Sequence, residues 1–191
     1  MTYVDALRPS AKPHALLYDI SGIIGGALFM ALSARFAIPL LFSPVPVTGQ
    51  TLAVLLMGAL LGSRRGSLGV LVYLAAGGFG LPAFTGGAAG LAHLAGPTGG
   101  YLAGFLVAAF LVGVLAEKGW DRQGWTTFLA MALGNIVIYA FGLFWLARFV
   151  GSERVLAAGL LPFIPGDLLK MLLATFLLPW GWRFLRKNRL G

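Results

Sequence analysis

The fold is decided by the stretch GSLGVLVYLAAGGFGLPAFTGGAAGLAHLAGPTGGYLAGFLVAAFLVGVLA, residues 66–116, which contains no Asp, Glu, Lys or Arg. The hydrocarbon core of a bilayer is ~30 Å thick, and a helix that crosses it needs about 20 apolar residues. This stretch is too long for one crossing, and glycine and proline interrupt it near its middle. It therefore predicts two membrane helices, at 66–84 and 99–116.

The rest of the chain has the same character. Charged residues make up 10% of the sequence and hydrophobic residues 59%, whereas ordinary globular chains contain about 25% and roughly 45–50% of these classes. Further runs without charge predict four more membrane helices, at 17–36, 50–62, 124–148 and 160–183. We therefore predict an all-α integral membrane protein. Residues 1–191 would form a single six-helix transmembrane bundle, with a short N-terminal segment at 1–16 and a basic tail at 183–191.

The basic residues predict the orientation of these helices. With six crossings both termini lie on one side, together with the loops that follow the second and fourth helices. That side holds ten Lys and Arg residues, and the other side holds three, Arg35, Arg148 and Arg154. Because Lys and Arg accumulate in cytoplasmic loops, we expect both termini to be cytoplasmic.

Two segments on the outer side cannot be regular helix. Residues 38–50 contain three prolines, and residues 77–104 contain ten glycines. Proline lacks an amide hydrogen, and non-helical backbone at membrane depth is tolerated only where it is buried in protein or lines a wet cavity. We expect irregular outer loops between helices one and two and between helices three and four.

The strongest functional signal is a pair of ionisable residues inside the last predicted helix, Asp167 and Lys170. Each charge at mid-helix costs on the order of 2.5–3.5 kcal/mol or more, and the i, i+3 spacing puts both on one face. One interpretation is a self-neutralising ion pair that fixes helix packing. The other is the polar floor of a ligand pocket, since Asp accepts hydrogen bonds and Lys donates them.

Weaker signals come from single polar and small residues. Asn135 and Tyr139 share one face of the fifth helix, and Gln50 opens the second; each could contact a ligand or bond to another helix. Ala27 and Ala31 lie on one face of the first helix. Small residues allow close helix approach in lipid, so this stripe could pack within the protein or dock another membrane subunit.

Several function classes are excluded or disfavoured. The chain has no cysteine and two histidines, so thiolate chemistry and a multi-histidine zinc site are excluded. There is no G-x-x-x-x-G-K-[ST] phosphate loop for ATP hydrolysis. The net charge of +8 comes from basic residues at helix ends, which set topology rather than bind nucleic acid. We expect no metal, no cofactor and no enzymatic activity.

Four segments, in this order, resemble the BioY family, the substrate-binding S components of energy-coupling-factor biotin transporters. They are SPVPVTGQTL at 43–52, GLPAFTGG at 80–87, LAGPTGGYLAGF at 94–105 and PGDLLK at 165–170. The resemblance implies a six-helix bundle in a prokaryotic plasma membrane that takes biotin from outside. It also implies partners: a transmembrane scaffold subunit and two ATPase subunits, which would use the ATP.

The resemblance also implies roles for particular residues. Asp167 and Lys170 match the P-G-D-x-x-K segment as biotin contacts, and Ala27 and Ala31 match the family's A-x-x-x-A motif for scaffold docking. Further biotin contacts are expected from Gln50, Asn135, Tyr139, Thr85, Gly86 and Gly87. The alternatives are an S component for another vitamin or a biotin precursor, and a membrane enzyme acting on a lipid-like substrate. The enzyme would need acidic metal clusters that the sequence lacks. The sequence leaves the orientation of biotin open.

Overall fold

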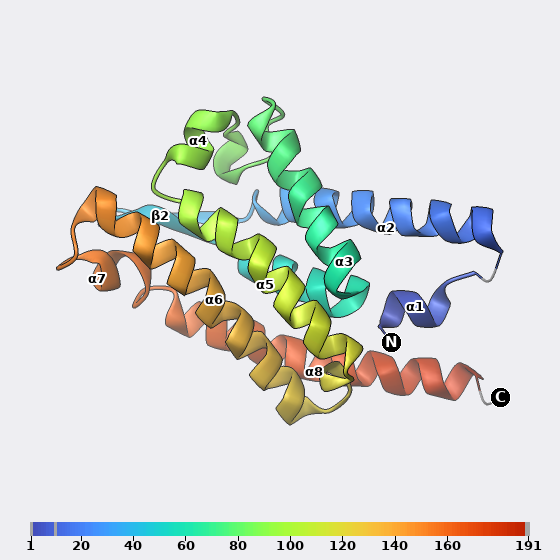
Figure 1. Ribbon diagram of the computed structural model, residues 1–191. Coiled ribbons are helices and arrows are strands. Elements are labelled where there is room, and N and C mark those ends of the chain that lie inside the picture. The colour runs from blue at the N-terminus through green and yellow to red at the C-terminus, as the bar shows by residue number, and fades with distance from the viewer. Residues whose placement is uncertain (1, 10, 190–191) are drawn as a thin grey trace.

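A computed structural model describes residues 2–9 and 11–189, with side chains through residue 185 (Figure 1). The last residues of the predicted basic tail therefore lie outside the described part. The helices are α1 (Tyr3–Leu7), α2 (Lys12–Ser33), α3 (Gln50–Gly78), α4 (Leu91–Ala95), α5 (Gly99–Glu117), α6 (Gly124–Val150), α7 (Val155–Gly159) and α8 (Ile164–Arg189). Two short 3₁₀ turns, η1 (Thr85–Gly87) and η2 (Trp120–Arg122), and two strands, β1 (Ala37–Leu40) and β2 (Ser43–Thr48), complete the fold.

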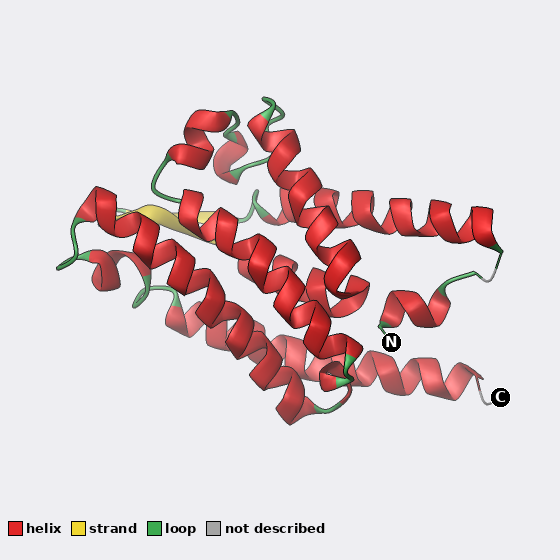
Figure 2. Ribbon diagram, viewed as in Figure 1, coloured by secondary structure: helices red, strands yellow, loops and turns green. Residues whose placement is uncertain are grey.

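Within the described residues, five helices are long and apolar enough to cross a membrane: α2, α3, α5, α6 and residues 164–185 of α8. The prediction of a multi-pass helical membrane protein is therefore confirmed. Figure 2 shows that helices make up nearly all of the regular structure. The observed bounds of α2, α5 and α6 lie within five residues of the predicted ones.

Helix α3 is a hairpin rather than one straight rod. Its backbone leaves helical geometry at Gly62, where φ is 86° and ψ is 177°. The amide nitrogen Nε2 of Gln50 lies 2.7 Å from the hydroxyl of Tyr73. In a straight helix these residues would be about 34 Å apart at ~1.5 Å per residue. The chain therefore folds back at Gly62 into two arms, residues 50–61 and 63–78, close to the predicted division between 62 and 66.

The proline-rich segment forms a two-stranded antiparallel sheet, which adds β structure to a fold predicted as all-helical. Ala37 pairs with Thr48 and Leu40 with Ser43, and the register is irregular between Ile38 and Leu40. Pro39 lies at this irregularity. Proline has no amide hydrogen to donate to the ladder, so it is tolerated at an irregularity, where the regular pairing is interrupted.

The second arm of α3 ends at Gly78 rather than at the predicted residue 84. The backbone at Gly80 has a φ of 102°, in the region that glycine adopts without steric cost, and Pro82 follows. The segment that joins α3 to α5 contains only η1 and the five-residue helix α4. As predicted, this glycine-rich connection is not a continuous helix.

Glycines set the closest helix packing in the core, between α3 and α5. A Cβ atom added at Gly113 of α5 would lie 2.6 Å from the carbonyl carbon of Gly62, and one added at Gly58 would lie 2.6 Å from the carbonyl oxygen of Ala109. Small residues at helix interfaces let backbones approach in lipid, where no hydrophobic force drives helices together. This contact holds the hairpin of α3 against the central helix α5.

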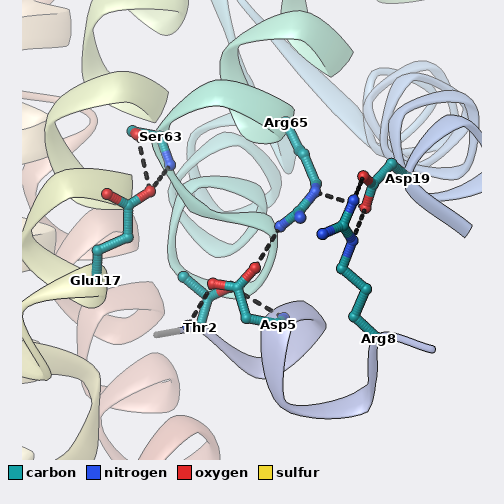
Figure 3. A network of polar contacts seen from close by, with 7 residues as sticks. All are labelled: Thr2, Asp5, Arg8, Asp19, Ser63, Arg65 and Glu117. Carbon is teal, nitrogen blue, oxygen red and sulfur yellow. Dashed lines mark hydrogen bonds and ion pairs between the residues drawn. The ribbon is translucent and has the colours of Figure 1, made fainter. Parts of the chain in front are cut away.

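A polar network ties α1 to the end of the bundle where α3 turns (Figure 3). Arg65 bridges Asp5 of α1 and Asp19 of α2, with nitrogen–oxygen distances of 2.7 and 2.8 Å, and Arg8 also pairs with Asp19 at 2.7 Å. Burial acts to raise the pKa of Asp5, but hydrogen bonds from Thr2 and Arg65 outweigh it, so this pKa is lowered overall. The network fixes α1 beside α2 and α3.

Candidate ligand-binding site

The candidate site is a cavity enclosed by β2, the start of α3, and helices α5, α6 and α8, beside the segment that joins α3 to α5. Its lining combines hydroxyl, amide and charged groups with apolar and aromatic side chains. The lining residues are Val45, Pro46, Thr48, Gln50, Thr51, Thr85, His93, Thr98, Tyr101, Leu102, Phe105, Ile138, Tyr139, Phe163, Asp167 and Lys170.

A buried cluster around Asp167 forms the charged part of this lining. The side chain of Asp167 accepts hydrogen bonds from Thr51 at 3.0 Å, from Lys170 at 2.9 Å and from the hydroxyl of Tyr139. Lys170 also donates to the carbonyl oxygen of Thr48 and to Thr51, both at 2.8 Å. Asp167 is only 4% exposed, and a buried carboxylate is tolerated only when it is paired and hydrogen-bonded in this way.

This cluster brings together three residues predicted from the sequence. Asp167 and Lys170 come from the first turns of α8, where their i, i+3 spacing places them on one face, and Tyr139 reaches them from α6. The structure is compatible with both interpretations of the Asp–Lys pair. The residues form an ion pair, and both also line the cavity.

A second polar group lies at the start of α3. Gln50 is 3% exposed; its side-chain nitrogen donates to Tyr73 at 2.7 Å, and its oxygen accepts from Thr85 at 2.9 Å. Thr85 belongs to η1, so this bond joins the connection between α3 and α5 to the α3 hairpin. Gln50 and Thr85 therefore both lie in the cavity lining, with the buried Tyr73 behind them.

His93 of α4 lies where the cavity meets a second, shallower pocket, since it lines both. Its ring stacks on Phe84 with a centroid distance of 4.9 Å, and its Nε2 lies 3.5 Å from the hydroxyl oxygen of Thr98. Burial lowers the pKa of His93 below its ordinary value, because removal from water disfavours the charged form of the ring. The sequence did not predict this position of His93 in the cavity wall.

Three predicted ligand contacts are not in the cavity lining. Gly86 and Gly87 lie in η1 beside Thr85, with positive φ angles of 69° and 82°. Asn135 is buried on α6, one turn before Tyr139, and its Oδ1 has no hydrogen-bond partner in the part of the chain that the structure describes. These three residues are close along the chain to Thr85 or Tyr139, which line the cavity, but they are not themselves among its lining residues.

The alanine stripe of α2 faces inward. Ala27 is 8% exposed and belongs to the hydrophobic core, and Ala31 is partly buried against that core. A Cβ added at the neighbouring Gly26 would meet Met57 and Leu61 of α3 at 3.2 Å. Ala27 therefore packs within the protein, whereas Ala31 is partly exposed.

Thr51 is the residue in the cluster that the sequence did not single out. It bonds to both members of the Asp–Lys pair. Threonine hydroxyls in membrane helices often bond to their own backbone, so the residue type by itself carries little signal. The sequence also did not single out Tyr101, which lines the cavity; its hydroxyl donates to the carbonyl oxygen of Gly159 at 2.8 Å and ties α5 to α7.

The fold and the site define a multi-pass membrane protein with a cavity that joins an Asp–Lys ion pair to apolar walls. Comparison with known sequences gives the family. A BioY family model matches residues 9–187, and the chain belongs to the BioY family.

Individual relatives agree with this assignment. The chain is 40% identical over 152 residues to the probable biotin transporter BioY of Pyrococcus horikoshii, which covers 79% of this chain and 90% of the relative. It is 41% identical over 159 residues to the biotin transporter BioY of Rhizobium etli, covering 79% and 85%. Among solved structures, it is similar to the biotin S-component of an ECF-type ABC transporter. That match has a TM-score of 0.75 and 28% identity, and it covers 92% of each chain.

Proposed function

We propose that this chain is a biotin-binding S component, which captures biotin from the outer side of the membrane and delivers it inward with an energy-coupling module. The observation that carries the proposal is the buried carboxylate of Asp167 in the wall of a partly apolar cavity. Family membership supports it, because matched relatives are named biotin transporters.

The chemistry of biotin suits this cavity. Its ureido ring has two N–H donors and one carbonyl acceptor, and its thioether ring and chain are apolar. A carboxylate is an acceptor that binds N–H donors strongly, so we assign Asp167 to the ureido group. Lys170, Gln50, Tyr139 and Thr85 complete the polar lining around it. Phe105, Ile138, Phe163 and Val45 supply apolar wall. The cavity lining does not support contacts from Asn135, Gly86 or Gly87.

We further propose six membrane crossings with both termini cytoplasmic in a prokaryotic plasma membrane. The hairpin at Gly62 supports an even number, because it divides one of the five long helices into two arms. The positions of the termini support a common side. The hydroxyl of Tyr3 in α1 bonds to the carbonyl oxygen of Leu178 in α8, and the two ends of the chain lie on the same side in Figure 1.

Transport is proposed to depend on partners, a transmembrane scaffold subunit and two ATPase subunits. The sequence lacks a phosphate-binding loop of the G-x-x-x-x-G-K-[ST] type, which would hold the phosphates of a nucleotide. We therefore assign ATP hydrolysis to the partner subunits and no catalytic step to this chain.

The test of this function is equilibrium binding of biotin to the purified, detergent-solubilised chain. We expect tight binding at a one-to-one ratio, and weaker binding of dethiobiotin, which keeps the ureido ring but lacks the thioether. If a folded chain prefers dethiobiotin or another vitamin, the proposed substrate is wrong, but the chain is still a substrate-binding S component. A folded chain that binds none of these compounds would refute the proposal.

The docking role proposed for Ala27 and Ala31 gives a prediction that separates the two residues. Ala27→Trp is expected to lower the yield of folded protein, because Ala27 is buried against α3 and overpacking a core costs about 1–3 kcal/mol. Ala31→Trp is expected to leave biotin binding within about twofold while it abolishes uptake driven by the coupling module. The measurements are size-exclusion yield, biotin affinity and uptake of labelled biotin in cells that express the module.

The control for this pair is Phe110→Trp, on an exposed face of α5, which is expected to bind and transport as the native chain does. Normal uptake by Ala31→Trp would remove Ala31 from the docking surface. A well-folded Ala27→Trp that binds biotin and is defective only in uptake would show that Ala27 also faces the scaffold during transport.

A further inference from the structure

Thr51 connects the two charged residues of the cavity through one hydroxyl group. Its Oγ1 donates to Oδ1 of Asp167 at 3.0 Å and accepts from the ammonium of Lys170 at 2.8 Å. A hydroxyl has one donor hydrogen and two acceptor lone pairs, so both bonds can exist together. Thr51 lies in the first turn of α3, and its two partners lie in the first turns of α8. It therefore joins two helices at the cavity.

Counting donors shows what the cluster can offer a ligand. The ammonium of Lys170 has three N–H donors, and it makes three bonds, to Thr48, Thr51 and Asp167. Its hydrogen-bonding capacity is used within the protein. The carboxylate of Asp167 has about four acceptor positions and receives bonds from Thr51, Lys170 and Tyr139. The capacity that is left for an N–H donor in the cavity therefore lies on Asp167.

The direction of that capacity depends on how the carboxylate is held. Lys170 alone could follow a rotating carboxylate, because its side chain is long and flexible. Thr51 has a short, stiff side chain with few χ1 conformations, and it belongs to a different helix. Tyr139 holds the other carboxylate oxygen from α6. Fixed donors on both oxygens leave the carboxylate one orientation, whereas loss of Thr51 would leave one oxygen bound to the flexible lysine alone.

We propose that Thr51 is a positioning residue, whose hydroxyl locks the carboxylate of Asp167 in the orientation that accepts the N–H groups of the ligand. The inference rests on the proposed function, since it takes biotin as the ligand. Thr51 itself acts through Asp167. Its importance for affinity is thus expected to depend on the presence of the Asp167 carboxylate.

The test is a double-mutant cycle made of the native chain, Thr51→Val, Asp167→Asn and the double variant. Valine has nearly the shape of threonine without the hydroxyl. Thr51→Val is expected to weaken biotin binding about tenfold in the native chain, the size expected for loss of a hydrogen bond to a charged group. In the Asp167→Asn background the same change is expected to cost less than about twofold, because residues that act through one contact are not additive.

Two further variants complete the design. Thr51→Ser keeps the hydroxyl and is expected to bind within about threefold of the native chain, as its bonds to the charged pair can be kept. Thr175→Val is the matched control. Thr175 lies in α8 outside the cavity, where its hydroxyl bonds to the carbonyl oxygen of Met171 at 2.8 Å, and its loss is expected to leave biotin affinity unchanged.

The outcomes separate this inference from the proposed function. Native affinity in Thr51→Val, or the same loss in both backgrounds, would overturn the positioning role while biotin binding by the native chain stands. If the native chain binds no biotin, the proposed function fails. Thermal unfolding of the same four proteins then decides whether Thr51 holds Asp167, because a direct contact makes their changes in Tm non-additive. Additive changes would overturn the inference.

Discussion

Replacing Asp167 with Asn is expected to weaken biotin binding by about 100-fold, because it removes a charge-assisted hydrogen bond from a buried carboxylate. The amide keeps the shape of the side chain but replaces one acceptor oxygen with a donor. The NH2 group would take the place of one carboxylate oxygen, so it would face either the donors of Thr51 and Lys170 or the hydroxyl of Tyr139. Isothermal titration calorimetry of the purified chain measures the change.

The same substitution also affects the folded state. Lys170 would lose its ion-pair partner, and its side chain is only 20% exposed. Breaking a buried pair by removing one partner costs about 3–5 kcal/mol, and partial exposure of the lysine reduces that cost here. We expect a lower Tm but a protein that still folds, because native proteins have unfolding free energies of about 5–15 kcal/mol.

The control for Asp167→Asn is Asp19→Asn, which removes a carboxylate from the network shown in Figure 3, away from the cavity. It is expected to change stability slightly and biotin affinity not at all. Unchanged biotin affinity in a folded Asp167→Asn protein would remove this carboxylate from the site and would leave the Asp–Lys pair with a packing role only.

Gly113→Leu is expected to prevent folding of the bundle. The Cβ of any larger residue at this position would fall 2.6 Å from the carbonyl carbon of Gly62, and backbone atoms cannot move aside as a flexible side chain can. Overpacking typically costs about 1–3 kcal/mol and occasionally more. Separating α5 from α3 would also expose the turn at Gly62 and the polar groups around it. We expect no monodisperse protein by size-exclusion chromatography in detergent.

Gly25→Leu is the matched control, because a Cβ at Gly25 of α2 would meet no atom within 4 Å. Leucine has a higher helix propensity than glycine by up to ~1 kcal/mol, so this variant is expected to be at least as stable as the native chain. A Gly113→Leu protein with the Tm of Gly25→Leu would show that the close approach of α3 and α5 is not required for the fold.

Local patterns explain which parts of the fold could be predicted. The break in α3 was predicted because Arg64 and Arg65 end one charge-free run, and the structure turns at the neighbouring Gly62. The positions of α2, α5 and α6 followed from apolar runs of membrane length. The β1–β2 pair was not predicted, since prolines argue against helix without indicating which extended segments pair.

The candidate site was also predictable only where local patterns point to its residues. Asp167 and Lys170 were recognisable because charge inside an apolar helix is costly, and their common face follows from helical spacing alone. Thr51 was not recognisable, because its partners lie 116 and 119 positions away. Asn135 matched the same sequence criteria as Tyr139, yet only Tyr139 lines the cavity.

The sequence by itself determined that the chain lies in a membrane as helices, where those helices run, and which helix holds a charged pair. These properties depend on segment length, hydropathy and helical periodicity, which are local. Only the tertiary structure decided that Thr51 and Tyr139 meet Asp167, that Ala27 packs on α3, and that α1 is held by Arg65. Such contacts join residues far apart in the chain, and they depend on how closely the glycines of α3 and α5 let neighbouring helices approach.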